Sequence, residues 1–374
     1  MADNEREHVR QRLEDWLAKE QADLRSGKLS ALRYPAGTGN SAETSFADFT
    51  YVADGRTQSK TYVFRRQLDQ SDLFLNADLR LPYNMMRALA HYPLVPTAIA
   101  VGIERDRSVI GSPFLVMEGV DGRVVNQVPN YNVEGWVAEL SPGDRRALWF
   151  NAIKTLAQLH KIDWRQHFQF LDDPKRGLAG LDQYLDWVKD WYIWARADRP
   201  MPVTDAALRY LLERKPTGTE VSVLWGDAAP ANTMFKPDLS IAAMLDFEMA
   251  ALGPGEVDLA WWLGGEEHFS SLVGVPRLEG LPTRAETIAL YESERGRTVE
   301  NMDYYFMLAY FRMATVIIRF IDRLIQNGKM PADTDAVTNN PTTRLLASLL
   351  GMELAPASGG YSLMERELAG ASKA

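Results

Sequence analysis

The chain contains no cysteine among its 374 residues. This absence excludes a disulfide framework, a thiolate nucleophile and a zinc site built on cysteine. Histidine is scarce as well, with five residues scattered along the chain. Because none of them stands in a triad-like setting, the sequence gives no support to a histidine-based catalytic triad. A chain without cysteine suits a reducing compartment, and we expect a cytoplasmic location.

An excess of positive charge is also missing. The net charge is −9 and the pI is about 5.2, so we expect no nucleic-acid partner held on a basic face. The charged N-terminus does not resemble a signal peptide. The most apolar stretch, residues 304–325, is interrupted by Arg312, Arg319 and Asp322. It therefore predicts a buried helix and no membrane span, since a span needs about 20 apolar residues.

The apolar residues that are present amount to 46% of the chain, enough for a large core in one bilobal unit or two domains. An amphipathic helix is predicted for residues 5–25, and three strands are predicted between residues 29 and 67 with a hairpin turn at Asp54–Gly55. Two further strands are predicted before residue 119, and the pattern then becomes helical. Ser141 and Pro142 provide an N-cap and a first-turn proline for one of these helices.

Two short apolar runs in the second half of the chain each end in polar residues. The first run ends at Trp225, and Asp227 then precedes Asn232 by five residues. The second run, residues 241–245, ends in Asp246. The Lys-Pro-Asp link between the runs has turn chemistry, so we expect two strands with these three polar side chains gathered at one end.

Phosphoryl transfer from a metal-bound nucleotide needs such a trio. We assign Asp227 as the catalytic residue that orients and deprotonates the acceptor hydroxyl. Asn232 and Asp246 are assigned to magnesium, which prefers a few hard oxygen ligands together with phosphate oxygens. Taken singly, each residue is equally consistent with a structural role, Asp227 and Asn232 as loop caps and Asp246 as a helix N-cap.

Gly-Asp-x-x-x-x-Asn, then Leu-Asp-Phe-Glu, then Gly-Pro-x-x-x-Asp-Leu-Ala resembles the aminoglycoside phosphotransferase and choline-kinase-like family. The Trp-Gly-Asp variant resembles a stand-alone bacterial branch related to the kinase-like domains fused to acyl-CoA dehydrogenases. The resemblance implies an α+β, two-lobed protein-kinase-like fold. Residues 1–119 would form a small antiparallel-sheet lobe with a leading helix, and residues 120–374 a larger, mostly helical lobe.

The resemblance also implies a nucleotide site in the first lobe. A glycine-containing turn at residues 37–41 would cover the phosphates, although a plain hairpin turn is the simpler interpretation. Arg65 stands where the family has a phosphate-binding lysine, and the expected glutamate partner falls near Pro82, with Asp78 as a substitute. The residues assigned to the nucleotide are Arg65, Thr38, Gly39, Asn40, Ser41, Glu118 and Val120, the last two through their backbone.

Supporting roles follow from the same resemblance. Trp225 replaces a loop-organising histidine, Glu248 replaces the glycine of kinases, and Asp258 is expected to brace the catalytic loop. His160 is expected to be a packed, hydrogen-bonded residue. The row Asp182, Asp186 and Asp190 is interpreted as a solvated face, with an acidic substrate lining as the alternative, and residues 266–268 are placed at the acceptor-site rim.

The sequence thus predicts a phosphotransferase that uses ATP or GTP with Mg²⁺ and acts on a small-molecule alcohol. The acceptor stays open between an aminoglycoside, a hydroxyacyl-CoA and another alcohol, and so does the oligomeric state. The arginine at position 65 motivates a rival interpretation, a non-catalytic pseudokinase that binds a nucleotide or another ligand. A hydrolase using Asp227 is a weaker alternative, because no second acid or histidine accompanies this aspartate.

Overall fold

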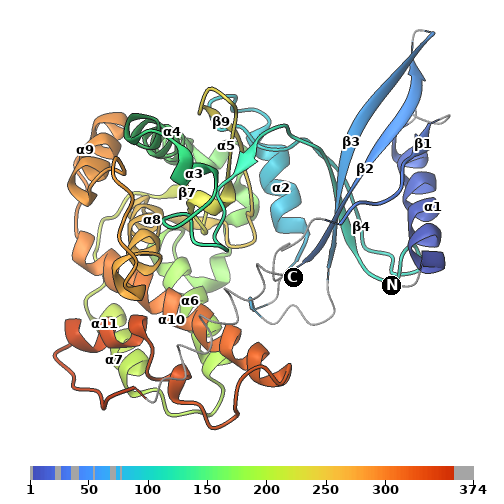
Figure 1. Ribbon diagram of the computed structural model, residues 1–374. Coiled ribbons are helices and arrows are strands. Elements are labelled where there is room, and N and C mark those ends of the chain that lie inside the picture. Colours follow the sequence, from blue (N-terminus) through green and yellow to red (C-terminus); the bar gives the residue numbers. More distant parts are fainter. Residues whose placement is uncertain are drawn as a thin grey trace. The chain divides into compact units, whose positions relative to one another are not determined.

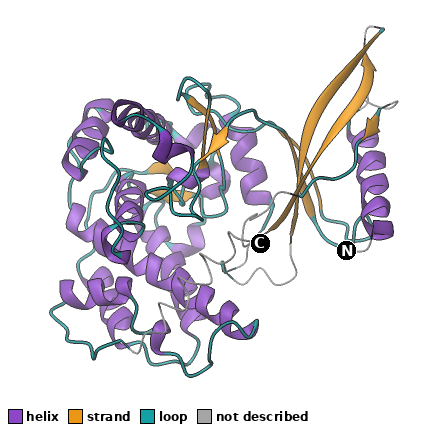
Figure 2. Ribbon diagram, viewed as in Figure 1, coloured by secondary structure: helices purple, strands orange, loops and turns teal. Residues whose placement is uncertain are grey.

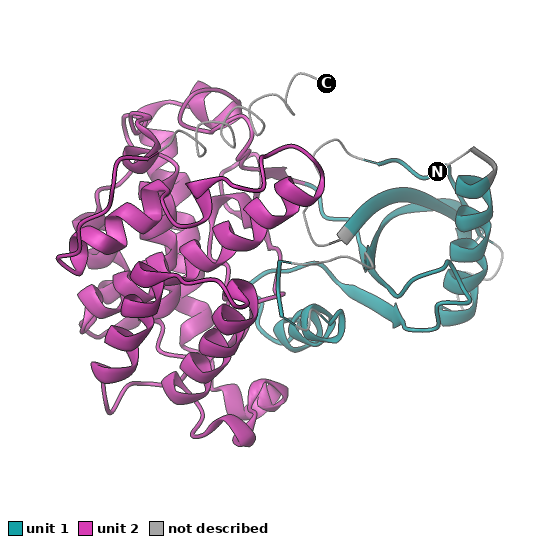
Figure 3. Ribbon diagram, turned by 90° about the horizontal axis from the view of Figure 1, so that it is seen from below, with its two compact units in different colours: residues 1–121 teal, residues 122–374 magenta. Residues whose placement is uncertain are grey.

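Figure 1 shows the computed structural model, which describes residues 3–21, 27–34, 42–53, 55–67, 73–75 and 78–357. The chain divides into two compact units, residues 1–121 and residues 122–374 (Figure 3). Strands dominate the first unit and helices the second, which agrees with the predicted α+β class (Figure 2). The turn at residues 37–41, with the four nucleotide candidates from Thr38 to Ser41, lies outside the described residues.

The first unit is built on an antiparallel sheet with the strand order β1-β2-β3-β5-β4. In the β2–β3 hairpin Ala53 lies opposite Arg56, and Gly55 occupies the turn with a φ of 71°. A hairpin turn with positive φ favours glycine, which has no Cβ to clash with the backbone. The predicted hairpin is confirmed. The described helices and strands of this unit are α1 (Asp3–Glu20), β1 (Lys28–Leu29), β2 (Ala42–Ala53), β3 (Arg56–Gln67), α2 (Arg80–Leu89), β4 (Ala100–Glu104) and β5 (Phe114–Glu118).

Helix α1 contributes one apolar face to the core of the first unit. The core shared by this helix and the sheet includes Val9, Leu13, Trp16, Leu17, Phe49, Tyr62, Phe64 and Phe114. Trp16 meets Phe114 edge to face, with ring centroids 5.2 Å apart, an arrangement that aromatic pairs prefer. The amphipathic helix predicted for residues 5–25 is confirmed as far as Glu20, and residues 22–26 lie outside the described residues. The apolar face of α1 is covered within its own unit.

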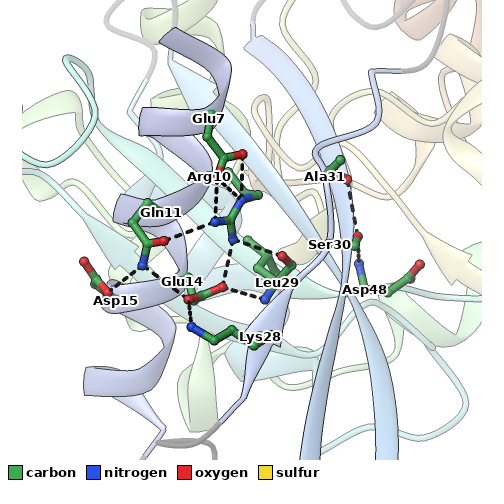
Figure 4. A network of polar contacts seen from close by, with 10 residues as sticks. All are labelled: Glu7, Arg10, Gln11, Glu14, Asp15, Lys28, Leu29, Ser30, Ala31 and Asp48. Atoms are coloured by element: carbon green, nitrogen blue, oxygen red, sulfur yellow. Dashed lines mark hydrogen bonds and ion pairs between the residues drawn. The ribbon is translucent and has the colours of Figure 1, made fainter. Parts of the chain in front are cut away.

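A buried carboxylate fastens α1 to β1 (Figure 4). Glu14 Oε2 accepts hydrogen bonds from Arg10 Nη1 and from the Leu29 backbone N–H, each at 2.8 Å. Its other oxygen accepts one from Lys28 Nζ at 3.1 Å. Burial raises the pKa of Glu14, but these hydrogen bonds outweigh burial and bring the pKa below its ordinary value. The stabilisation is therefore present above the carboxyl's ordinary pKa and is lost as the pH falls through the lowered one.

Replacing Glu14 with alanine is expected to destabilise the contact of α1 with β1 by about 2–3 kcal/mol, because the buried Leu29 N–H loses its acceptor and the Arg10 guanidinium loses one of several. Hydrogen exchange of peptides from α1 and β1 measures this as lost protection. The control is Asp15→Ala on the same helix, where the exposed carboxylate accepts, among the described residues, only from Gln11 and the expected change is within about 0.5 kcal/mol. Equal effects of the two substitutions would contradict the role given to Glu14.

The second unit is mostly helical and carries two small antiparallel sheets, one of β7 and β10 and one of β6, β8 and β9. Its described helices and strands are β6 (Arg123–Val124), α3 (Trp136–Glu139), α4 (Pro142–His160), α5 (Trp164–His167), α6 (Leu181–Arg196), α7 (Pro202–Glu213), β7 (Ser222–Leu224), β8 (Thr233–Phe235), β9 (Ile241–Met244), β10 (Ala251–Gly253), α8 (Glu256–His268), α9 (Arg284–Arg295), α10 (Met302–Gln326) and α11 (Pro341–Leu349). Helix α4 begins as predicted, with the Ser141 side chain accepting from the Asp144 N–H.

Helix α10 is the central helix of the second unit. It is long and apolar enough to cross a membrane by length and composition, yet 78% of its most apolar window is buried inside the protein. The prediction of a buried helix is confirmed. Its buried residues include Arg312, a cation on a helix whose other buried residues are mostly apolar.

The acidic row on α6 is paired with cations. Arg176 Nη1 binds Asp186 and Asp190 at 2.8 and 2.6 Å, and Asp182 is ion-paired with Lys215. These carboxylates are partly exposed, so the pairs contribute little to stability. The contacts agree with the predicted solvated face and leave the row without the free negative charge that an acidic substrate lining would need.

Candidate active site

Two loops of the second unit leave their strands side by side. The loop 225–232 runs from β7 to β8, and the loop 245–250 runs from β9 to β10. Because β7 pairs with β10 and β8 pairs with β9, both loops emerge at the same end of the strand pairs. The Leu245 N–H donates to the Asn232 carbonyl at 2.8 Å, which extends the β8–β9 pairing to the base of the two loops. The gathering of polar residues predicted from the two apolar runs is therefore observed.

The backbone of both loops is in the left-handed region at one residue each. Gly226 has a φ of 87°, and a Cβ at this position would lie 1.9 Å from the Met249 carbonyl oxygen. Only glycine fits that approach. Asp246 has a φ of 59° and does carry a side chain. Such strain is tolerated by few residue types, aspartate among them, and it concentrates at functional sites.

The three residues of the predicted trio lie together. Asn232 Nδ2 donates to Asp227 Oδ2 at 2.8 Å and to the Asp227 carbonyl at 3.0 Å. Trp261 Nε1 donates to the other carboxylate oxygen of Asp227 at 2.7 Å. Burial raises the pKa of Asp227, the negative charge of Asp246 raises it further, and hydrogen bonds from Trp261 and Asn232 act in the opposite direction. Asp246 is thus close enough to Asp227 for their charges to interact.

The donor set fits a magnesium ion that also binds phosphate. Asn232 uses its Nδ2 on Asp227, which leaves its Oδ1 as the ligand atom. Asp246 supplies a carboxylate from the neighbouring loop. In the part of the chain that the structure describes, no three histidine, cysteine, aspartate or glutamate side chains gather into a self-sufficient metal site. Mg²⁺ bound through one or two protein oxygens together with phosphate oxygens needs no such cluster.

Asp258 braces the first part of the loop 225–232, which carries the predicted catalytic residue. Its fully buried carboxylate accepts from the backbone N–H groups of Trp225 at 2.6 Å and Gly226 at 3.0 Å. It also contacts His160 Nε2 at 3.1 Å, and His160 Nδ1 lies 2.7 Å from the Tyr291 hydroxyl. Since a carboxylate only accepts, Nε2–H donates to Asp258 and Nδ1 accepts from Tyr291. His160 is therefore the packed, hydrogen-bonded residue that the sequence predicts.

Trp225 links the two loops. Its indole Nε1 donates to the Leu245 carbonyl at 2.7 Å, and the side chain is 2% exposed. These contacts are the packing and hydrogen bonding expected from a substitute for a loop-organising histidine. Glu248 lies two residues after Asp246 in the second loop and is partly buried.

Two residues at this site were not assigned from the sequence. Trp261 on α8 binds Asp227 directly, and Arg312 on α10 donates from Nη2 to the Gly226 carbonyl. Trp261 stands in the Asp-Leu-Ala-Trp-Trp motif, and Arg312 interrupts an apolar helix, so each carried a signal. Neither signal shows that these side chains meet the catalytic loop, because that depends on how α8 and α10 pack.

The nucleotide candidates with described positions belong to the first unit. Arg65 lies on β3, opposite Leu115 of β5. The next residue, Arg66, is ion-paired with Glu43 across the sheet at 2.9 Å. Pro82 occupies the first turn of α2, where its missing N–H is tolerated. Asp78, considered as a replacement for the missing glutamate, accepts from Arg80 Nε at 2.6 Å.

The predicted adenine segment follows β5. The Glu118 backbone N–H donates to the Ile99 carbonyl at 2.9 Å, so of its two backbone groups the N–H is already used within the unit. Its side chain forms an ion pair with Lys60. Val120 lies two residues beyond the strand and is partly buried.

The three residues placed at the acceptor rim occupy different environments. Glu266 is 4% exposed and accepts from Trp149 Nε1, with Arg277 Nη2 at 3.3 Å. Burial raises the pKa of Glu266 to about 7. Glu267 is ion-paired with Arg284, and His268 Nδ1 lies 3.3 Å from the Thr342 hydroxyl. Glu266 is therefore part of the core of the second unit, and the prediction that it lines an open rim is wrong.

A protein-family model described as the phosphotransferase enzyme family matches residues 42–296. Human acyl-CoA dehydrogenase family member 11 is 26% identical over 334 residues, an alignment that covers 84% of this chain and 39% of the relative. Mouse acyl-CoA dehydrogenase family member 10 is 26% identical over 248 residues, covering 63% of this chain and 22% of the relative. The chain thus spans less than half the length of these curated relatives.

The chain is also similar to solved structures of proteins that are named as phosphotransferases. A candidate aminoglycoside phosphotransferase from Ralstonia eutropha JMP134 matches with a TM-score of 0.63 at 22% identity, over 95% of this chain and 98% of the other. The GDP complex of aminoglycoside 2'-phosphotransferase-IIIa matches with a TM-score of 0.51 at 12% identity, over 91% and 97% of the two chains. Identities this low show the fold alone. They confirm the predicted two-lobed protein-kinase-like α+β fold.

Proposed function

Because the chain belongs to the phosphotransferase enzyme family, we propose that it transfers the γ-phosphate of ATP or GTP, with Mg²⁺, to a hydroxyl group of a small molecule. The observation that carries this proposal is the trio in the second unit. Asn232 binds Asp227 at 2.8 Å, and Asp246 lies close enough to raise the pKa of Asp227. A base and two metal-ligand side chains on adjacent loops are what phosphoryl transfer requires.

Asp227 orients the acceptor hydroxyl and takes its proton. A carboxylate whose pKa is raised by burial is a stronger base than an exposed one, provided that it stays ionised at the working pH. Two hydrogen bonds, from Asn232 and Trp261, fix both carboxylate oxygens. The side chain is thus held in one orientation before the acceptor arrives, which reduces the entropy lost in reaching the reactive geometry.

Asn232 and Asp246 hold the magnesium ion, the first through Oδ1 and the second through its carboxylate. When bound there, the ion supplies positive charge to the phosphate oxygens. The left-handed backbone at Asp246 and the hydrogen bond from Asn232 Nδ2 to Asp227 fix the two ligand side chains. The chain thus contributes the oxygens of Asn232 and Asp246, which hold the ion, and the Asp227 carboxylate, which takes the proton of the acceptor hydroxyl.

For the nucleotide we propose Arg65 as the phosphate-binding cation, in place of the family's lysine. Arginine keeps the charge and presents two donors to phosphate oxygens. The turn from Thr38 to Ser41 is proposed to cover the phosphates, and the backbone of Glu118 and Val120 to contact the base. A solved neighbour described as a GDP complex supports a nucleotide site of this kind and is the reason to test GTP beside ATP.

For the acceptor we propose a metabolic alcohol, with hydroxyacyl-CoA thioesters as the first class to test. The curated relatives are named as acyl-CoA dehydrogenases, which supports an acyl-CoA-linked alcohol. The structural neighbours named as aminoglycoside phosphotransferases make those antibiotics the competing class. The paired acidic row on α6 supports the first choice, since a polycationic aminoglycoside favours free carboxylates.

The test is a panel of acceptors incubated with the protein, Mg²⁺ and either ATP or GTP. The panel contains hydroxyacyl-CoA thioesters, the corresponding free hydroxy acids, simple alcohols and aminoglycosides. Phosphorus NMR identifies a phosphate monoester of the acceptor and separates it from free phosphate. Acceptor-dependent ester formation supports the proposal, whereas nucleotide binding without transfer to any acceptor favours the pseudokinase alternative, for which Arg65 and Pro82 are the motivating residues.

A further inference from the structure

A cavity of about 420 Å³ lies in the first unit, where the sheet and the start of α2 come together. Its described lining comes from the end of β3, from β4 and the loop that follows it, and from the residues before α2. These residues are Gln67, Asp78, Leu79, Ile103, Arg105, Arg107 and Pro113. Small organic ligands occupy sites of roughly 300–1,000 Å³, so the cavity is large enough for one. None of its described lining residues belongs to the proposed catalytic, metal or nucleotide sites.

Positive charge prevails in the described lining, although the whole chain has a net charge of −9. The lining contains the guanidinium groups of Arg105 and Arg107 and one carboxylate, that of Asp78. Asp78 is held by a third arginine, since its Oδ1 accepts from the Arg80 N–H at 2.9 Å and its Oδ2 accepts from Arg80 Nε at 2.6 Å. The one acid of the described lining is therefore paired with a residue outside that set.

Asp78 keeps its charge at neutral pH. Burial raises its pKa, but the hydrogen bonds and the charge of Arg80, together with the charge of Arg105, bring the pKa below its ordinary value. The guanidinium of Arg105 is thus close enough to Asp78 for their charges to interact. The pair with Arg80 is maintained at neutral pH, and Arg105 contributes its charge to the cavity.

The carboxylates next to Arg105 in the chain are occupied as well. Glu104 Oε2 accepts from Trp16 Nε1 at 3.0 Å. Its Oε1 accepts from the backbone N–H groups of Arg105 and Asp106, each at 2.8 Å. Asp106 accepts from the N–H and the hydroxyl of Ser108, also at 2.8 Å. Since both acids bind groups of their own unit in this way, an added anion is the partner that this part of the cavity favours.

The rest of the lining favours a compact organic body. Leu79, Ile103 and Pro113 are apolar, and Gln67 adds a polar amide. Arginine is the side chain that binds phosphate groups through two donors at once. A small phosphate monoester joins an anionic head to an organic body and so matches both parts of the lining, whereas the arginines would repel a cation.

We propose that this cavity binds a small organic phosphate monoester, with the phosphate on Arg105 and Arg107 and the organic body against Leu79, Ile103 and Pro113. The site shares no described residue with the proposed active site or with the proposed nucleotide site. The inference does not rest on the proposed function, because the cavity can bind a phosphate monoester in a protein that transfers no phosphate.

Phenyl phosphate is the probe, since it is a phosphate monoester with a compact apolar body. The full chain is titrated calorimetrically with phenyl phosphate, inorganic phosphate and benzoate, without nucleotide and without Mg²⁺. We expect a Kd for phenyl phosphate below about 1 mM and binding of the other two probes that is at least about fivefold weaker. The physical reason is that inorganic phosphate lacks the organic body and benzoate lacks the second negative charge.

Two substitutions in the lining should change this affinity in opposite directions. Arg105→Met removes the charge and keeps an apolar stem, so the Kd should rise about tenfold, the loss of a charge-assisted hydrogen bond. Asp78→Asn removes the negative charge and keeps an oxygen that can accept from the Arg80 N–H, so the Kd should fall about two- to fivefold. The matched control is Arg87→Met, since Arg87 is an exposed arginine of α2 that lies over the Tyr83 ring and is not among the lining residues. The Kd should stay within about twofold in this control, because an exposed charge away from the site is screened.

Arg65→Met separates this site from the proposed nucleotide site. The Kd for phenyl phosphate should stay within about twofold in this variant and in the presence of Mg²⁺ and ATP. Binding that Arg105→Met leaves unchanged and that Arg65→Met abolishes would place the probe in the nucleotide site and overturn the inference. Equal affinity for benzoate and phenyl phosphate would also overturn it. So would the absence of binding at probe concentrations up to about 10 mM, in a protein shown by circular dichroism to be folded.

Discussion

Asp227→Asn is expected to lower kcat for phosphate transfer by about 10²- to 10⁴-fold, the usual contribution of a general base. The carboxylate is the group that accepts the hydroxyl proton, and an amide of the same size does not. Nucleotide affinity should change little, because the proposed mechanism assigns the metal to Asn232 and Asp246 and not to Asp227. Single-turnover transfer kinetics and calorimetric titration with the magnesium nucleotide measure the two quantities separately.

Two further variants show whether a loss of kcat in Asp227→Asn comes from the missing base. An asparagine at position 227 cannot accept from Asn232 and Trp261 at once, so Asp227→Ala is measured beside it to exclude an effect of a rotated amide. Asp238→Asn is the matched control. Asp238 is an exposed residue on the turn between β8 and β9, where Ser240 is its only donor in the part of the chain that the structure describes, and kcat should stay within about twofold. Transfer at the natural rate in both variants of Asp227 would refute its role as the base.

The second large effect is expected on stability. Asp258→Ala should lower the free energy of unfolding of the second unit by about 3–5 kcal/mol, the cost of removing one partner from a buried charged network. Two backbone N–H groups, of Trp225 and Gly226, and the His160 Nε2–H would lose their acceptor. These donors would be left buried without an acceptor, since Trp225, His160 and Asp258 are each 2% exposed or less.

Chemical denaturation of Asp258→Ala, followed by circular dichroism, measures this loss. The control is Asp182→Ala on α6, which removes a partly exposed ion pair with Lys215 and should cost less than about 1 kcal/mol. Should Asp258→Ala be no less stable than this control, the bracing role of Asp258 would be wrong. A stable Asp258→Ala variant without activity would point to a direct part in the chemistry.

The sequence predicted the individual helices and strands from local patterns, whereas it predicted the two-lobed fold and the family through the resemblance of its motifs. Hydrophobic periodicity predicted the amphipathic helix α1. The buried helix α10 was predicted from an apolar stretch that charged residues interrupt. The trio was predicted from the spacing of Asp227 and Asn232 and from the position of Asp246 after the next apolar run. The three residues gather as predicted because both loops follow paired strands. The phosphotransferase enzyme family and the two-lobed kinase-like fold are confirmed. The catalytic, metal and nucleotide roles of the individual residues stay predictions.

The contributions of Trp261 and Arg312 could not be predicted in the same way. Their contact with the catalytic loop depends on how α8 packs against α10, and these helices are separated by α9 in the chain. A charged residue in an apolar helix indicates that another group must hydrogen-bond or pair with it, but the sequence does not show which element supplies that group. The predicted position of Glu266 at the acceptor rim was wrong for a related reason. An acidic residue near a helix end suggests exposure, whereas Glu266 accepts a hydrogen bond from Trp149 and can therefore be buried.

The proposed function depends on a magnesium-dependent nucleotide site completed by Asp246, and calorimetric titration is the test of that site. The purified protein is titrated with ATP and with GTP, each with and without Mg²⁺, beside Asp246→Asn. We expect binding of at least one nucleotide that requires Mg²⁺ and that the substitution weakens about tenfold or more, since a carboxylate ligand is lost. Binding of neither nucleotide by a folded protein, or binding that neither Mg²⁺ nor Asp246 affects, would contradict it.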